Sequence, residues 1–120
     1  MSKEKAQALL KEWQERLGLQ EWRIKLQPNC SPEDMDGEEC CGLTHWQEVN
    51  RTAMIQIQDK AYYGNRVVPF DFEKTLVHEL LHLKMCLITD VEDETTARVG
   101  HMLIDSLARA FVDAKRYKLH

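Results

Sequence analysis

The chain has 120 residues, a length that corresponds to one domain spanning residues 1–120. Hydrophobic residues make up 43% of it and charged residues 30%, which is typical of an ordered globular protein and excludes a disordered one. The formal net charge of −4 argues against a nucleic-acid-coating protein. Because no apolar run reaches the length of a membrane span and the first residues are polar, we expect a cytoplasmic protein with no membrane partner.

The N-terminal third is expected to form a helix, a strand and a loop. Apolar residues recur at helical spacing over residues 3–17, and Gly18 stands where a C-terminal cap belongs. Residues 22–26 alternate between apolar and polar, the pattern of a strand with one buried face. Residues 28–42 are acidic and contain proline and glycine, so we expect a loop there without a packed element.

Two strands and two helices follow. Residues 43–48 and 52–58 are predicted to be strands. Asp71 is expected to cap a second helix that runs to about Leu87 and is buried, because apolar residues cover most of its circumference. The acidic residues 90–94 open a third helix of roughly 20 residues with basic residues near its end, as the helix dipole favours. This order predicts an α+β fold: an N-terminal helix, a small three-stranded sheet, a buried central helix and a long C-terminal helix.

The central helix contains His78-Glu79-Leu80-Leu81-His82, an HExxH motif. Positions i and i+4 share a helix face, so His78 and His82 can reach one ion, and neutral imidazole is a ligand of zinc (Zn²⁺). Glu79 lies about 100° round the helix from His78, where a general base for a zinc-activated water is needed. The alternative is a pair of hydrogen-bonded core histidines beside a solvated glutamate.

With this motif the chain resembles the zincin metallopeptidases, specifically their small single-domain members. The resemblance covers residues 75–83 closely and the element order of the whole chain. Metzincins carry Gly and His where this chain has Met85 and Ile88, so that branch is not matched. His101 and Asp105 have the spacing of the gluzincin third ligand and its Asp partner, with His in place of Glu. A third His is similar to what SprT-like proteases use.

The third ligand has two possible sources downstream of the motif. Residues 92–94 are carboxylates at a helix start, where the helix dipole already favours them. His101 falls beside the apolar stripe of the third helix, so we expect it to face inwards, with Asp105 one turn further on to accept a hydrogen bond from a ligand imidazole. We therefore expect His101 to be the third ligand. A carboxylate ligand, Glu94, and a structural His101–Asp105 pair are the alternatives.

Strand and loop residues near the motif could belong to the same site. By the resemblance, residues 43–48 form an exposed edge strand that an extended peptide can pair with, and His45 and Trp46 could line the cleft. An ordinary half-exposed strand is the alternative. Tyr62 and Tyr63 could donate to a developing oxyanion, although two loop tyrosines more often serve packing.

The cysteines do not suggest a second site. Cys40 and Cys41 are adjacent, which does not match the spacing of structural zinc ligands. We therefore expect Cys30, Cys40 and Cys41 to be free thiols and not a metal or redox site, and we expect Cys86 in the core.

The residues and the resemblance together predict a zinc-dependent, metallopeptidase-like hydrolase. In this prediction His78, His82 and His101 hold zinc, and Glu79 is the base that acts on a zinc-activated water. The substrate is a peptide or protein whose identity, like the oligomeric state, does not follow from the sequence. Two alternatives stay open: a non-catalytic regulatory or binding module stabilised by zinc, and a SprT-like protease that acts on DNA-bound proteins.

Overall fold

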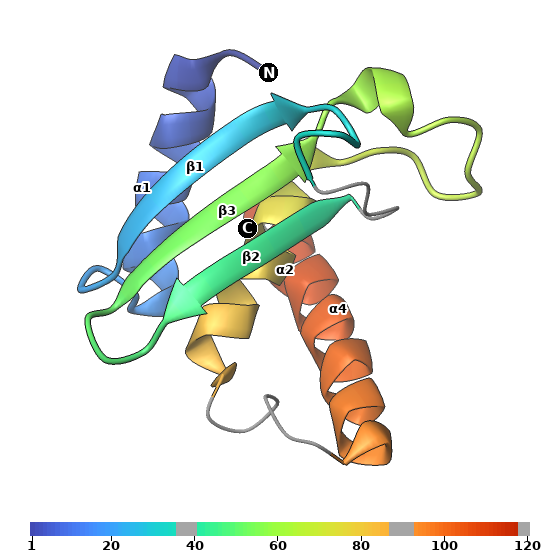
Figure 1. Cartoon of the computed structure of the whole chain (residues 1–120). Helices are drawn as coiled ribbons and strands as arrows, with labels where there is room; N and C mark the ends of the chain where they lie inside the picture. Colours follow the sequence, from blue (N-terminus) through green and yellow to red (C-terminus); the bar gives the residue numbers. More distant parts are fainter. Residues whose placement is uncertain (36–40, 87–92, 118–120) are drawn as a thin grey trace.

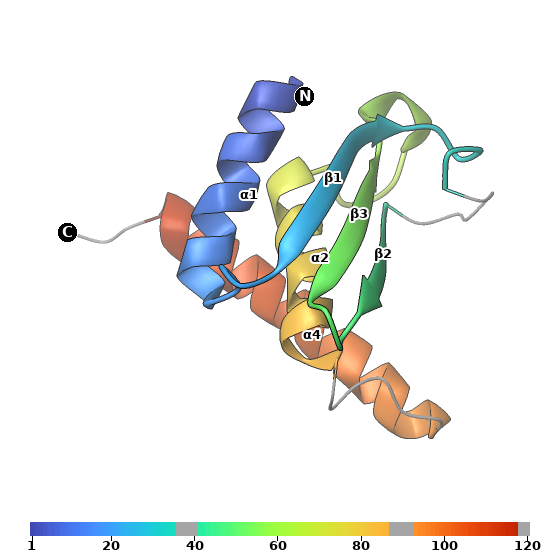
Figure 2. The ribbon, with the colours of Figure 1, turned by 60° about the vertical axis from the view of Figure 1, so that its left-hand side comes forward.

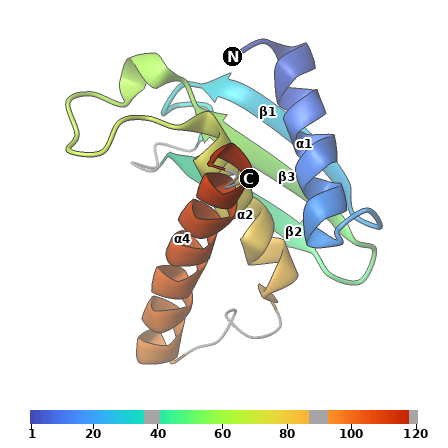
Figure 3. The same cartoon turned by 180° about the vertical axis from the view of Figure 1, so that it is seen from behind.

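The structure is a computed structural model that describes residues 1–35, 41–86 and 93–117. Within these ranges three α-helices, a short 3₁₀ helix and a three-stranded mixed sheet form an α+β fold in the predicted order. The elements are α1 (Lys3–Leu17), β1 (Arg23–Cys30), β2 (Gly42–Gln47), β3 (Thr52–Gln58), η1 (Lys60–Tyr62), α2 (Phe72–Lys84) and α4 (Glu94–Arg116). The helices lie on one face of the sheet (Figures 1 and 2), and the view from behind shows α1, α2 and α4 in front of it (Figure 3).

The sheet has the strand order β1-β3-β2, so β3 lies in the middle and β2 at one edge. β3 pairs in parallel with β1 and antiparallel with β2. The prediction of a strand over residues 52–58 is confirmed, and the strand predicted over residues 43–48 starts one residue earlier, at Gly42. The edge position expected for this strand is also confirmed.

The first strand continues into residues 28–42, where we expected only a loop, and that part of the prediction is wrong. β1 runs through Pro28 to Cys30. Proline has no N–H to donate and is tolerated on an edge strand, which β1 is. The pairing register shifts between Gln27 and Cys30, and Asn29 has a positive φ of 61°. Pro28, which we expected to follow the end of the strand, is therefore accommodated by this irregularity in the pairing of β1 with β3.

The central helix α2 is buried, as predicted. The Asp71 side chain caps it by accepting a hydrogen bond from the Lys74 backbone N–H at 3.1 Å. The helix ends at Lys84 with Met85 as its C-cap, before the expected end near Leu87, which lies outside the described residues. Its fully or nearly fully buried apolar side chains belong to Leu76, Val77, Leu80, Leu81 and Leu83. α2 is therefore the element around which the sheet and the other helices pack.

The C-terminal helix α4 packs along α2 through a narrow stripe. Asp93 caps its start by accepting from the backbone N–H groups of Thr95 and Thr96, each at 3.3 Å. The buried residues of α4 recur every four positions: Gly100, Ile104, Ala108 and Val112. No helix in the described parts of the chain combines the length and apolar character that crossing a membrane requires.

The far end of α4 is fixed to the start of α2 by a buried carboxylate. Glu73 is only 8% exposed, and its Oε2 accepts a hydrogen bond from the indole N–H of Trp13 at 2.7 Å. Lys115 and Arg116, at the end of α4, both form ion pairs with Glu73. Arg116 also holds Asp71 through two hydrogen bonds of 2.6 and 2.9 Å. α1, α2 and α4 are thus joined at one point.

Candidate metal centre

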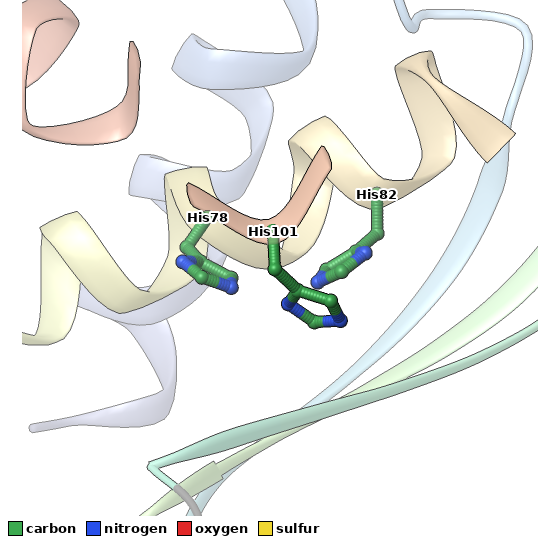
Figure 4. Close-up of side chains that lie close together, drawn as sticks. All are labelled: His78, His82 and His101. Atoms are coloured by element: carbon green, nitrogen blue, oxygen red, sulfur yellow. The ribbon is translucent and has the colours of Figure 1, made fainter. Parts of the chain in front are cut away.

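Three histidines from two helices meet beside α2. His78 and His82 lie on one face of that helix, and His101 reaches the same space from α4 (Figure 4). One ring nitrogen from each lies within 4.8 Å of the others. The ring centroids are 5.1 Å apart for His78 and His82 and 4.8 Å apart for His82 and His101. The spacing predicted from the HExxH motif and from His101 is therefore realised in space.

Burial keeps the two α2 histidines neutral. It lowers the pKa of His78, although Asp105 acts in the opposite direction. Burial and the neighbouring histidines lower the pKa of His82 to about 4. A neutral imidazole has a free lone pair on one nitrogen, which is the form that binds a metal ion. At neutral pH both side chains are therefore ready to act as ligands.

His101 is exposed, so the expectation that it faces inwards is wrong. The buried stripe of α4 contains Gly100 and Ile104, and His101 lies about 100° round the helix from Gly100. It consequently points past the helix–helix contact towards His78 and His82 and not into the core (Figure 4).

Asp105 lies next to His78, one turn beyond His101. Its Oδ1 is 3.6 Å from Nδ1 of His78, slightly longer than a hydrogen bond, and its Oδ2 is 3.0 Å from Nη2 of Arg109. From the sequence we expected Asp105 to accept a hydrogen bond from a ligand imidazole. In the structure the imidazole next to it is that of His78. A carboxylate in this position favours one orientation of the ring.

Glu79 points towards the sheet and is 5% exposed, so it is not a solvated glutamate. The hydroxyl of Thr44 on β2 donates a hydrogen bond of 2.6 Å to its Oε1. Burial raises the pKa of Glu79 to about 7, and the hydrogen bond from Thr44 opposes this rise. The group expected to be a general base therefore titrates near neutral pH in the metal-free protein.

A groove of about 740 Å³ opens beside the histidines. It is lined from four directions: by α2, by α4, by β2 and by the segment before α2. The residues are Cys41, Gly42, Leu43, Thr44, Trp46, Tyr63, Val68, Pro69, Asp71, Lys74, Thr75, His78, Glu79, His82, Ala97, His101, Asp105, Ala108 and Arg109. The proposed base and all three histidines thus face one shared space.

The other candidate residues divide between the groove and the surface. Trp46 and Tyr63 line the groove, whereas His45 and Tyr62 are not among its described lining residues. The Tyr63 hydroxyl donates to the Val68 carbonyl at 2.5 Å, and its ring packs against Phe70. That hydrogen bond favours the packing interpretation of Tyr63.

The alternative ligand Glu94 and the described cysteines do not belong to the three-histidine group, although Cys41 lines the same groove. Glu94 is exposed in the first turn of α4 and does not belong to the three-histidine group. Cys30 and Cys41 are free thiols, as predicted. Cys86 is buried, in line with the expectation that it belongs to the core. Cys40 and the acidic residues 90–92 lie outside the described residues.

No protein-family model, curated protein or solved structure matches this chain. The chemistry of the centre therefore follows from its donors. Three imidazole nitrogens suit zinc, and also iron, nickel or copper. Catalytic zinc sites combine three protein ligands with one open position, and the groove beside the histidines offers space for that position. Zinc–nitrogen bonds are about 2.0–2.1 Å long, so ligand atoms of one ion lie at most about 4.2 Å apart. The nitrogens, within 4.8 Å of one another, would have to approach slightly to bind one ion.

No pattern in the sequence indicates the two β2 residues that lie against Glu79. Thr44 donates to its carboxylate, and a side chain at Gly42 would begin 2.8 Å from its Oε2. Both contacts cross more than 30 residues of chain, and no local pattern marks which strand residue will face a given helix residue. Only the packing of β2 on α2 reveals them.

Proposed function

We propose that the protein is a zinc-dependent hydrolase that cleaves peptide bonds, a small metallopeptidase of the zincin type. The observation that carries this proposal is the placement of three imidazole side chains and a buried carboxylate around one groove. His78, His82 and His101 would hold the ion. Glu79 directly follows His78 on α2 and points towards β2. The resemblance of the HExxH motif to zincins supports the same assignment.

Each side chain has a distinct role in the proposed reaction. Zinc, when bound, supplies a Lewis acid that polarises the scissile carbonyl and makes water more acidic. Glu79 accepts the proton of the attacking water at its carboxylate and passes it to the leaving amine. Glu79 would ionise more readily with a cation among the histidines, since an opposite charge favours the ionised form and would lower the pKa of this carboxyl. Asp105 keeps the His78 ring oriented.

The position of β2 supports a peptide as the substrate. β2 is an edge strand, and Leu43, Thr44 and Trp46 on it line the groove. An extended peptide can add to such an edge through main-chain hydrogen bonds. The scissile bond would then lie between β2 and the histidines.

The experiment that tests this function compares wild-type protein with Glu79→Gln. Both proteins are purified without added metal, their zinc content is measured by elemental analysis, and cleavage of a mixed peptide library is followed by mass spectrometry. We expect about one zinc per chain in both, and a loss of hydrolysis by several orders of magnitude in the variant. Equal cleavage by the two proteins would remove Glu79 from the mechanism.

The burial of Glu79 favours a second candidate, a zinc-stabilised binding module that cleaves nothing. A carboxylate that is 5% exposed and hydrogen-bonded to Thr44 is well satisfied as a structural residue. The same experiment separates the two functions: zinc-loaded wild-type protein without any hydrolysis supports the binding module.

A further inference from the structure

Strand β2 lies directly against the Glu79 carboxylate. The Thr44 hydroxyl donates to Oε1 at 2.6 Å. Two residues earlier, Gly42 brings the backbone so close that a Cβ would lie 2.8 Å from Oε2 and 2.9 Å from Cγ of Glu79. Any side chain at that position would press on the carboxylate, so the glycine permits the close approach of β2 to α2.

The strand register explains why these two residues face the helix. Gly42 and Thr44 pair with Ile57 and Ile55 of β3, both completely buried on the side of the sheet that carries the helices. Residues paired across neighbouring strands have their side chains on the same face of the sheet, so Thr44 points the same way as its buried partner Ile55. Threonine is also restricted in χ1 by its branched Cβ. The direction of its hydroxyl is therefore restricted by the strand and by χ1, independently of Glu79.

A general base acts well only when it is held in a productive geometry. Glutamate has three side-chain torsions, and a displacement of about 1 Å is enough to reduce a rate severely. For Glu79, burial alone restricts the space without fixing the direction of the carboxylate. The hydrogen bond from Thr44 fixes one oxygen and leaves the other for proton transfer.

We propose that Thr44 is a positioning residue, whose hydroxyl holds the Glu79 carboxylate in the orientation in which it acts as the base. This inference rests on the proposed hydrolytic function. Thr44 does not bind the ion or the substrate in this role, and acts only through Glu79. Its removal therefore reduces turnover and leaves zinc binding intact.

The test uses two variants of Thr44 and one matched control. Thr44→Val keeps the shape and removes the hydroxyl, while Thr44→Ser keeps the hydroxyl. Thr52→Val removes a hydroxyl from the neighbouring strand, where Thr52 donates to Asn50 at 2.7 Å and does not line the groove. For each zinc-loaded protein we measure zinc content, thermal unfolding, and kcat and KM on the best substrate from the peptide library.

We expect Thr44→Val to lower kcat by about 10–100-fold, the usual effect of losing a group that orients an active residue, with KM and zinc content close to wild type. Thr44→Ser and Thr52→Val should retain kcat within about threefold, since both keep the bond to Glu79. If Thr44→Val does not fold, the comparison is made with Thr44→Ala and Thr44→Ser, and a kcat difference between these two supports the same role.

Two outcomes overturn the inference in different ways. Active wild-type protein with an unchanged kcat in Thr44→Val, or with a change in KM alone, shows that the hydroxyl does not position the base. Wild-type protein that carries zinc and cleaves no peptide overturns the proposed function, and the role of Thr44 in catalysis with it.

Discussion

Replacing Glu73 tests whether the contact between the start of α2 and the end of α4 stabilises the fold around the candidate metal centre. We consider Glu73→Ala, Glu73→Gln and the control Glu12→Ala. Glu12 shares Lys115 with Glu73, at 3.0 Å, but its side chain is 34% exposed compared with 10% for Glu73. The two carboxylates therefore differ mainly in burial and in the bond from Trp13.

The magnitude follows from what each change leaves behind. Glu73→Ala leaves the buried indole N–H of Trp13 without its partner, which costs about 1–3 kcal/mol. Lys115 keeps Glu12 and Arg116 keeps Asp71, so each lost ion pair contributes only about 0.2–1 kcal/mol. We expect a total loss of roughly 1.5–5 kcal/mol in the free energy of unfolding. Glu73→Gln retains an acceptor for Trp13 and should lose about 1 kcal/mol or less.

The assay is equilibrium unfolding in urea, followed by circular dichroism in the presence of a chelator, because a bound metal would add its own stabilisation. A zinc titration of the same proteins then shows whether the loosened end of α4 weakens binding at His101. A Glu73→Ala protein no less stable than Glu12→Ala would refute the role given to the buried carboxylate.

Four further predictions concern the centre itself. In a zinc titration, His101→Ala should abolish tight binding, whereas Glu94→Ala should leave it unchanged. In the same titration, Asp105→Ala should weaken binding by about 10–100-fold. By urea unfolding, Gly42→Ala should lower stability by about 1–3 kcal/mol, because its Cβ meets Glu79 at 2.8 Å. In metal-free protein, Glu79 should favour folding at low pH and lose about 3 kcal/mol of that contribution between pH 4.5 and 7, because its pKa is about 7 folded and 4.5 unfolded. Stability measured against pH for Glu79→Gln should lack this component.

Local patterns in the sequence were enough to predict α2 and its motif. Helical periodicity places His78 and His82 on one face without any knowledge of the tertiary structure. Asp71 was recognisable as the N-cap, since a short polar side chain precedes the apolar run. The same local logic failed at Pro28, because the edge position of β1 that tolerates proline is a property of the whole sheet.

Non-local packing decided the rest of the candidate site. The prediction that His101 lies near the motif histidines is confirmed, and the prediction that it faces inwards is wrong. Hydrophobic periodicity predicts which face of a helix is apolar, but not the angle at which two helices cross. The contact of Thr44 with Glu79 depends on which strand lies over α2 and in which register. Neither the position of β2 over α2 nor its register follows from a short window of neighbouring residues.

The three histidines are divided between α2 and α4, so metal binding would be coupled to the packing of these two helices. His78 and His82 keep their spacing whenever α2 is helical, whereas His101 joins them only when Ile104 packs α4 onto α2. An ion held by all three would connect the two ends of the intervening chain segment as a covalent cross-link does. At a free ion concentration 100 times the Kd, it would stabilise the folded state by about 2.7 kcal/mol. A substitution that only loosens the two helices should therefore lower the affinity of a site whose three ligands are intact.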